Sequence, residues 1–240
     1  IRDGRLVAEL IEKGAVRTVF QPIVDLATRR PVGFEALGRG THPSLTDRPA
    51  PLLELADQFQ LAVQLSQLFR RRAVCDASSL PSGSTIFLNV HARELTAREF
   101  FESLTPVGGY LGGGLRFVLE IAEASVTDVS SMARAREALR ELGYGLAYDD
   151  FGAGQARLLE LVDVPPDYLK LDRAMIDGID HAASRQQLVS ALVTVVAEAG
   201  VRVVAEGIET EPTASMCESL GCHLGQGFLF GDPDRPPVRA

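Results

Sequence analysis

The chain has 240 residues and a mass of 25.9 kDa, with 46% hydrophobic and 23% charged residues. This is the composition of a globular protein with enough apolar side chains for a core, which excludes disorder of the whole chain. Acidic residues outnumber basic ones by 32 to 24, and the net charge is −8. Non-specific binding to the phosphate backbone of a nucleic-acid polymer is therefore not expected, since it requires clustered positive charge.

The cysteines and the apolar segments bear on location. Three cysteines form no CxxC pair, and an odd number without a disulfide framework indicates reduced thiols and a cytoplasmic location. The most apolar stretch, residues 188–199, is about half of the roughly 20 residues that span a bilayer, so we expect no membrane segment here. The chain begins with Ile1 rather than Met. We therefore expect residues 1–240 to be one domain of a longer protein with an upstream sensory or regulatory part.

The first half of the chain predicts four strands. Residues 18–24 and 31–37 flank a turn-like segment that is too short for a crossover helix, so these two strands should be antiparallel neighbours. Apolar runs at 85–90 and 116–121 each end in a polar residue and predict two further strands.

The second half repeats one order of elements. An amphipathic helix over 128–142 ends before Gly143, a residue suited to the positive φ of a helix C-terminus, and a strand over 145–149 follows. The same order recurs with a helix over 184–199 and a strand over 201–206. Thr210 and Pro212 mark the start of another helix. Strands are also expected at 167–171 and 227–230, and this alternation predicts parallel strands joined by helices.

Eight strands with intervening helices predict an α/β fold, a (β/α)8 TIM-like barrel with an irregular, antiparallel first pair of strands. An open doubly wound sheet is the alternative. In such a barrel the C-terminal ends of the strands share one face. The polar residues expected there are Glu35, Asn89, Glu120, Asp149, Asp150, Lys170, Asp172, Glu206, Glu209 and Gln226.

Carboxylates that meet at one mouth repel one another and raise one another's pKa. Bound cations would remove this repulsion, and oxygen ligands without Cys or His favour Mg²⁺ or Mn²⁺ over zinc. The adjacent Asp149 and Asp150 would bridge two ions roughly 3.5–4 Å apart, an arrangement that cleaves phosphate esters. Each acid taken alone is more often a helix cap or a solvated loop residue, so the prediction depends on their occurrence at successive strand ends.

Motifs along nearly the whole chain resemble those of EAL domains. They occur in the family's order: Gln21-Pro-Ile-Val-Asp25, Gly33-Phe-Glu-Ala-Leu37, Leu88-Asn-Val90, Leu119-Glu-Ile-Ala-Glu123, Asp149-Asp-Phe-Gly-Ala-Gly154, Leu169-Lys-Leu-Asp172, Ala205-Glu-Gly-Ile-Glu-Thr210 and Gly225-Gln-Gly-Phe-Leu-Phe230. The resemblance implies a single EAL domain over residues 1–240, a barrel with an antiparallel first strand, and a homodimer. It also implies hydrolysis of cyclic di-GMP to linear pGpG with two Mg²⁺ or Mn²⁺ ions.

The resemblance further implies a role for each matched residue. The first metal is expected to be held by Glu35, Asn89, Glu120 and Asp149. Asp149 is expected to bridge to a second ion that Asp150 also holds. Lys170 would orient or activate the attacking water, and Glu206 would be a general base or a ligand of the second metal. The remaining matches are the substrate-binding residues Gln21, Leu37, Arg39, Asp172 and Gln226, and the supporting residues Glu123 and Glu209.

Two segments depart from the family pattern. Gly38-Arg39-Gly40 stands where the family often has Leu-Arg-Trp, and Gln155-Ala156-Arg157 stands where the loop after the aspartate pair usually reads Tyr-Ser-Ser. That loop is thought to couple dimer contacts to metal binding in the family. A catalytically weak or inactive EAL module that binds cyclic di-GMP or a protein partner therefore stays open as an alternative. A third alternative, an unrelated Mg²⁺-dependent barrel enzyme with a carbonyl substrate, explains the acids but not the ordered motifs.

Overall fold

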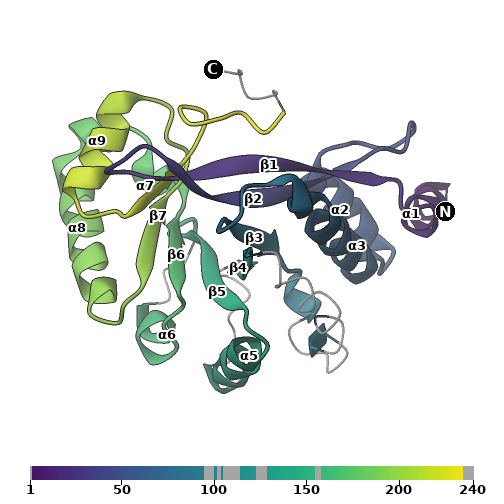
Figure 1. Cartoon of the computed structure of the whole chain (residues 1–240). Helices are drawn as coiled ribbons and strands as arrows, with labels where there is room; N and C mark the ends of the chain where they lie inside the picture. Colours follow the sequence, from purple (N-terminus) through teal and green to yellow (C-terminus); the bar gives the residue numbers. More distant parts are fainter. Residues whose placement is uncertain are drawn as a thin grey trace.

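The computed structural model describes residues 2–94, 100–101, 104, 114–122, 129–154 and 158–234. Within these residues the strands pair in chain order from β1 to β8 and close into a barrel. Figure 1 shows helices α5 to α9 outside the barrel strands, while a long β1–β2 hairpin runs from the barrel to α1, α2 and α3. The closed barrel confirms the predicted (β/α)8 fold and excludes the open sheet.

The strand bounds agree with the sequence prediction at seven of eight positions. The strands are β1 Val16–Asp25, β2 Pro31–Gly40, β3 Thr85–Asn89, β4 Arg116–Ala122, β5 Gly145–Phe151, β6 Tyr168–Leu171, β7 Arg202–Ala205 and β8 Leu224–Gln226. β1 is antiparallel to both β2 and β8, and all the other neighbouring pairs are parallel.

The strand predicted at 227–230 is wrong. The last strand lies earlier, at Leu224–Gln226, and residues 227–230 form a turn in which the amide of Phe230 donates to the carbonyl of Gly227 at 3.0 Å. Leu-Gly-Gln contains a single large apolar residue and gives no apolar run in the sequence. It becomes a strand because β1 and β7 offer it pairing partners on both sides.

Helices of the second half lie outside the barrel strands, as the alternation predicted, whereas α1, α2 and α3 lie beside the β1–β2 hairpin. The α-helices are α1 Arg2–Glu12, α2 Pro49–Gln58, α3 Ala62–Asp76, α5 Val129–Glu141, α6 Leu158–Asp163, α7 Arg173–Ile176, α8 Ala183–Ala197 and α9 Glu211–Ser219, and single 3-10 turns occur at Ala77–Ser79, Ala92–Glu94 and Ile179–His181. Gly143, two residues after the end of α5, has φ of 80°. Thr210 caps α9 by accepting from the amide of Thr213 at 3.3 Å, so both predicted helix boundaries are confirmed.

Three apolar clusters hold these elements. The largest lies between the barrel and its outer helices, and a small one fills the barrel interior. A separate cluster joins α1, α2 and α3 to the start of β1 and includes Leu10, Val16, Leu52 and Leu65. The hairpin strands therefore run from the barrel into a second core. Among the described residues, no helix has the length and apolarity needed to cross a membrane, and the three cysteines are free.

Candidate active site

The polar residues of the mouth form one layer of the barrel interior. The small interior cluster contains Ile23, Phe87, Val118, Ala147, Tyr168, Val204 and Leu224. Side chains two positions apart on a strand lie on the same face. Two positions further toward the mouth on each of these strands stand Gln21, Asn89, Glu120, Asp149, Lys170, Glu206 and Gln226. Glu35 completes the layer on β2, where it pairs with Gln21 of β1 and with Phe87 of β3.

The sequence analysis expected Glu35 at the end of its strand. In the structure it lies in the middle of β2. β2 pairs with β3 only as far as Ala36, which lies opposite Leu88, but β2 itself continues to Gly40 as part of the hairpin with β1. Glu35 therefore lies at the mouth because the barrel pairing ends there, while the strand runs on.

The neighbouring Asp149 and Asp150 owe their position to an irregularity in β5. Tyr148 pairs with Leu169 and Phe151 with Leu171, so β5 uses one residue more than β6 over this step. Asp150 has φ of 56°, which is uncommon for a residue with a Cβ atom. A bulge of this kind redirects a side chain. It explains how two successive carboxylates lie at the same mouth.

The ammonium group of Lys170 lies among four carboxylates. Its Nζ atom is 2.7 Å from Glu120 Oε1, 2.8 Å from Glu206 Oε1, 2.9 Å from Asp149 Oδ1 and 3.3 Å from Glu35 Oε2. The Lys170 side chain is 1% exposed. One buried cation thus faces four acids, and the cluster keeps a net negative charge.

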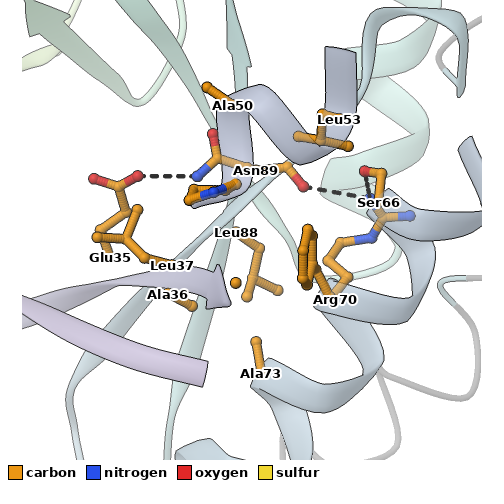
Figure 2. Close-up of a pocket in the computed structure, with 13 residues that line it drawn as sticks. Glu35, Ala36, Leu37, Ala50, Leu53, Ser66, Arg70, Ala73, Leu88 and Asn89 are labelled. Atoms are coloured by element: carbon orange, nitrogen blue, oxygen red, sulfur yellow. Dashed lines mark hydrogen bonds between the residues drawn. The ribbon is translucent and has the colours of Figure 1, made fainter. Parts of the chain in front are cut away.

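Glu35 is the best-bonded of these acids. It accepts hydrogen bonds from Asn89 Nδ2 at 2.9 Å and from Gln226 Nε2 at 2.6 Å, and Figure 2 shows the amide of Asn89 directed at its carboxylate. Gln226 Nε2 also donates to Gln21 Oε1 at 3.0 Å. The two glutamines and the asparagine therefore orient Glu35 from both sides.

The acids differ in their proton affinity. Burial raises the pKa of Glu120 well above its usual value, the charge of Glu35 adds to this, and Lys170 offsets it only in part. Burial likewise raises the pKa of Glu206 to about 8. Burial acts in the same direction on Glu35, but Lys170 and the hydrogen bonds from Gln226 and Asn89 lower its pKa below the usual value. The mouth thus combines an acid whose pKa is lowered, Glu35, with two acids whose pKa values are raised, Glu120 and Glu206.

The donor set fits divalent cations. Asp149, Asp150 and Glu206 each offer a carboxylate oxygen, and these three oxygens lie within 4.8 Å of one another. Both carboxylate oxygens of Glu120 and Oδ1 of Asp149 are buried and accept no well-aligned hydrogen bond from the described residues, although Lys170 lies within ion-pair distance. Such oxygens are costly unless a cation satisfies them. Ligands of oxygen alone favour a hard ion.

Two cavities adjoin this cluster. One, of about 310 Å³, is lined by Gln21, Glu35, Asp149, Asp150, Lys170, Glu206, Glu209 and Gln226, together with Arg173, Gly207, Gly227 and Phe228. The other, of about 220 Å³, lies between β2, β3, α2 and α3, and Leu37, Leu53 and Leu88 are among its apolar lining residues. Glu35 lines both cavities, so an apolar hollow continues directly from the acidic mouth.

Gly38, one of the departures from the family pattern, shapes the second cavity. A Cβ atom at position 38 would lie 2.3 Å from the ring of Phe69 on α3. The absence of a side chain at this position therefore lets the Phe69 ring lie against β2, where both residues line the cavity.

Three residues predicted for the site form their hydrogen bonds or ion pairs with groups outside the acidic cluster around Lys170. Arg39 forms a two-pronged ion pair with Asp234, with Nε–Oδ1 and Nη2–Oδ2 distances of 3.0 Å each. Asp172 caps α7 by accepting from the amide of Ala174 at 2.8 Å. Glu209 lies at the rim and pairs with Arg173 at 2.8 Å.

Two further predictions fall where the structure gives no description. Glu123, and the segment Gln155-Ala156-Arg157 that departs from the family pattern, lie outside the described residues.

Sequence reasoning missed several charged residues near the site. Arg70 and Glu94 form a buried ion pair next to the end of β3. Asp234 forms an ion pair with Arg39. Arg70 stands in the run Arg70-Arg71-Arg72, which resembles a solvated helix face. Its burial follows from the packing of α3 on β3, and the sequence carries no signal for it.

A closed barrel with carboxylates, an amide and a lysine at the C-terminal mouth places the protein among TIM barrels with a polar site at that face. Residues 5–233 match the profile of the family described as EAL domain. The chain belongs to the EAL domain family.

Named relatives and solved structures extend this finding. The chain is 34% identical over 226 residues to cyclic di-GMP phosphodiesterase PA2567 of Pseudomonas aeruginosa, covering 91% of this chain and 38% of the relative. It is 29% identical over 231 residues to cyclic di-GMP phosphodiesterase RocR of the same species, covering 93% and 58%. The chain thus spans between about a third and three fifths of the length of these curated relatives.

Among solved structures, the cyclic di-GMP complex of the PaMucR phosphodiesterase superimposes with a TM-score of 0.84 at 28% identity, covering 97% of each chain. A manganese and cyclic di-GMP complex of Klebsiella pneumoniae BlrP1 gives a TM-score of 0.81 at 29% identity, covering 91% of this chain and 56% of that one.

Proposed function

We propose that this domain hydrolyses cyclic di-GMP to linear pGpG. The observation that carries the proposal is the complete polar layer at the mouth: Glu35, Asn89, Glu120, Asp149, Lys170 and Glu206 converge from six strands, as the resemblance implied. Relatives named cyclic di-GMP phosphodiesterases and structural neighbours bound to that dinucleotide support the choice of substrate.

Two Mg²⁺ or Mn²⁺ ions would complete the site. Glu35, Asn89, Glu120 and Asp149 would hold the first ion, and Asp149, Asp150 and Glu206 would hold the second. When bound, such ions supply an activated water and neutralise charge on the phosphodiester. The buried Oε2 atom of Glu120, which has no hydrogen-bond partner among the described residues, supports this assignment.

The protein's own groups have distinct tasks in this proposal. Lys170 orients the attacking water and stabilises the added negative charge. Glu206 lies in contact with Lys170 in the same cavity and serves as a ligand of the second ion or as the general base for that water. Attack on phosphorus breaks one of the two 3′–5′ phosphodiester bonds and leaves a 5′-phosphate on the linear product. Glu35 stays ionised, because Lys170 and its hydrogen bonds favour the charged form.

Substrate binding would use the surroundings of this cluster. Gln21 and Gln226 line the acidic cavity and Leu37 lines the apolar one, which suits a phosphodiester beside a flat nucleobase. Arg39 and Asp172 would contact the dinucleotide at the edge of the groove. Glu209 and Glu123 would support the loops around it.

We also propose that the domain forms a homodimer. Leu158, Leu159, Val162, Leu188 and Val195 on α6 and α8 are 53–78% exposed. All of them except Leu159 line an apolar cavity of about 390 Å³ that also touches Phe151 and Gly152. An apolar face of this kind is typical of a protein interface. Light scattering should show a dimer, and Leu159→Glu should give a monomer. A monomeric wild-type chain at high micromolar concentration would contradict this.

The organisation of the parent protein is also proposed. Residues 1–240 would be one EAL domain in the cytoplasm, joined to a sensory or regulatory part, as the greater length of the curated relatives suggests.

One experiment tests the activity. Purified protein is incubated with cyclic di-GMP and Mg²⁺ or Mn²⁺, and the products are separated by ion-pair chromatography. We expect pGpG to appear and to disappear when a chelator is added. Tight binding of cyclic di-GMP without any pGpG would instead support the alternative, a non-catalytic receptor module.

A further inference from the structure

Arg70 and Glu94 form a buried ion pair that the proposed reaction does not use. Arg70 lies on α3 and is 4% exposed, and Glu94 follows β3 and is 1% exposed. Their Nη1–Oε1 and Nη2–Oε2 distances are 3.0 and 2.5 Å. The Arg70 guanidinium also lies 5.4 Å above the ring of Phe100. Desolvating two charges is unfavourable, and apolar residues of similar volume often replace such a pair without loss of stability. A contribution to the stability of the fold is therefore a weak explanation for the presence of this ion pair.

The pair lies where β3 loses its strand partner. β2 pairs with β3 as far as Ala36 opposite Leu88 and then continues into the hairpin. On the other side β3 keeps its partner, because the amide of Val90 donates to the carbonyl of Glu120 at 3.0 Å. The backbone groups of Asn89 and His91 alternate with that amide and are left without a strand on the β2 side.

Side chains of the buried cluster replace the missing strand. Arg70 Nη1 donates to the carbonyl of Asn89 at 3.4 Å. The amide of His91 donates to Glu94 Oε1 at 3.2 Å and to Ser66 Oγ at 3.3 Å. Figure 2 shows Asn89 between Glu35 on one side and Arg70 with Ser66 on the other, with hydrogen bonds in both directions.

We infer that Arg70 and Glu94 are positioning residues for the cation site: they fix the backbone on both sides of Asn89 and so hold its amide beside Glu35. The inference rests on the proposed role of Asn89 as a ligand of the first ion. Without the pair, the end of β3 loses two of its three hydrogen bonds to this cluster, those from Arg70 to the Asn89 carbonyl and from the His91 amide to Glu94, and keeps only the bond to Ser66. The amide of Asn89 then samples more orientations. Neither charged residue needs to touch ion or substrate.

The test compares Mn²⁺ affinity with fold stability. The double variant Arg70→Met/Glu94→Leu replaces the pair by apolar side chains of similar size. We expect its melting temperature to stay within a few degrees of wild type, while the dissociation constant for Mn²⁺, measured by the electron paramagnetic resonance signal of free Mn²⁺, rises about tenfold. The matched control Arg72→Met/Asp76→Leu removes an exposed ion pair on the same helix, with an Nε–Oδ2 distance of 2.8 Å, and should leave the affinity unchanged.

A second variant guards against failure of the first to fold. Arg70→Lys keeps the buried charge but loses the planar fork that reaches Glu94 and the Asn89 carbonyl together, so we expect a smaller loss of Mn²⁺ affinity, about threefold. If either variant folds and binds Mn²⁺ as wild type does, the positioning role is overturned.

The reference variant Asn89→Ala separates this inference from the proposed function. Loss of Mn²⁺ affinity in Asn89→Ala but not in the Arg70 variants overturns the inference and leaves the function standing. Loss in both sets, in a wild-type protein that makes no pGpG, supports the inference and overturns the function. Unchanged affinity in Asn89→Ala overturns the inference, because it removes the ligand role on which the inference rests.

Discussion

The Nζ atom of Lys170 lies 2.7 Å from Oε1 of Glu120, and both side chains are buried inside the barrel mouth. Lys170 is the single cation in contact with Glu35, Glu120, Asp149 and Glu206 among the residues that the structure describes. These acids raise the pKa of Lys170 well above its usual value, against the opposing effect of burial. The lysine is therefore a permanent positive charge at neutral pH.

Lys170→Met should be costly in two ways. Four carboxylates then lack their counter-charge, and breaking a buried ion pair costs about 3–5 kcal/mol of unfolding free energy. Turnover should also fall on the order of a hundredfold or more, because the water-orienting group is lost. Chemical denaturation in chelator and in Mn²⁺ measures the first effect, and Mn²⁺ should restore part of the loss.

The matched control for Lys170 is Lys13→Met. Lys13 pairs with Glu9 on the exposed face of α1 at 2.6 Å. This variant should leave both stability and turnover close to those of the wild type, because an exposed ion pair contributes little. Equal stability of the two variants would contradict the proposed importance of Lys170.

Glu35→Ala should abolish turnover through loss of the first ion. Glu35 holds its position through Asn89, Gln226 and Lys170, so the truncation removes a ligand and also releases those three groups. Titration calorimetry with Mn²⁺ should show one site fewer or at least tenfold weaker binding. Normal hydrolysis by this variant would overturn the metal assignment, and Glu54→Ala on the exposed side of α2 serves as the control.

The stability of the metal-depleted protein should fall as pH rises. The pKa of Glu206 is about 8 in the folded protein against 4.5 for an unperturbed carboxyl. The folded state therefore retains a proton that the unfolded state releases, and the free energy of unfolding decreases between about pH 4.5 and pH 8. Thermal melts in chelator across this range should show the decline. Glu206→Gln should make the decline shallower, and the raised pKa of Glu120 accounts for the part that remains. An equally steep decline in this variant would show that Glu206 does not contribute.

Asp150→Gly should separate backbone strain from metal binding. Asp150 has φ of 56°, a conformation that costs about 1–2 kcal/mol for a residue with a Cβ atom and that glycine adopts freely. Part of this gain is lost to the greater entropy of glycine in the unfolded chain. The melting temperature should stay level or rise, while the number of Mn²⁺ ions bound falls from two to one. A lower melting temperature with two ions still bound would contradict both expectations.

Asp234→Asn should strengthen substrate binding. Asp234 engages the guanidinium of Arg39 through both carboxylate oxygens, and an anionic substrate must compete with it for that cation. We expect KM for cyclic di-GMP to fall several-fold with little change in kcat. Arg39→Ala should raise KM and make the Asp234 substitution neutral, and additive effects in the double variant would show that the two residues act independently.

The barrel and most of its mouth were predictable because both depend on short-range patterns. The period-two alternation that places Val118 inward also places Glu120 inward, and a helix ending at Gly143 followed by an apolar run indicates a crossover. The strand at Leu224–Gln226 escaped prediction because only its pairing partners on both sides make it one.

Long-range partners could not be predicted in the same way. The pairing of Arg39 with Asp234 joins residues 195 positions apart, and the burial of Arg70 depends on how α3 packs. Charged side chains of this kind look like surface residues until the fold brings an opposite charge beside them. The bulge that turns Asp150 into the mouth is likewise a product of pairing between β5 and β6.

The β1–β2 hairpin has a consequence for how sequence change acts on this protein. β2 carries Glu35 inside the barrel and ends at Gly40, which packs against Leu10 and Leu52 of the outer helical core. A single strand thus joins the cluster of α1, α2 and α3 to an acid of the mouth. We therefore expect substitutions in α1 or α2 that loosen this cluster to weaken the proposed cation binding at a distance, so that selection for stability and selection for activity act on the same residues.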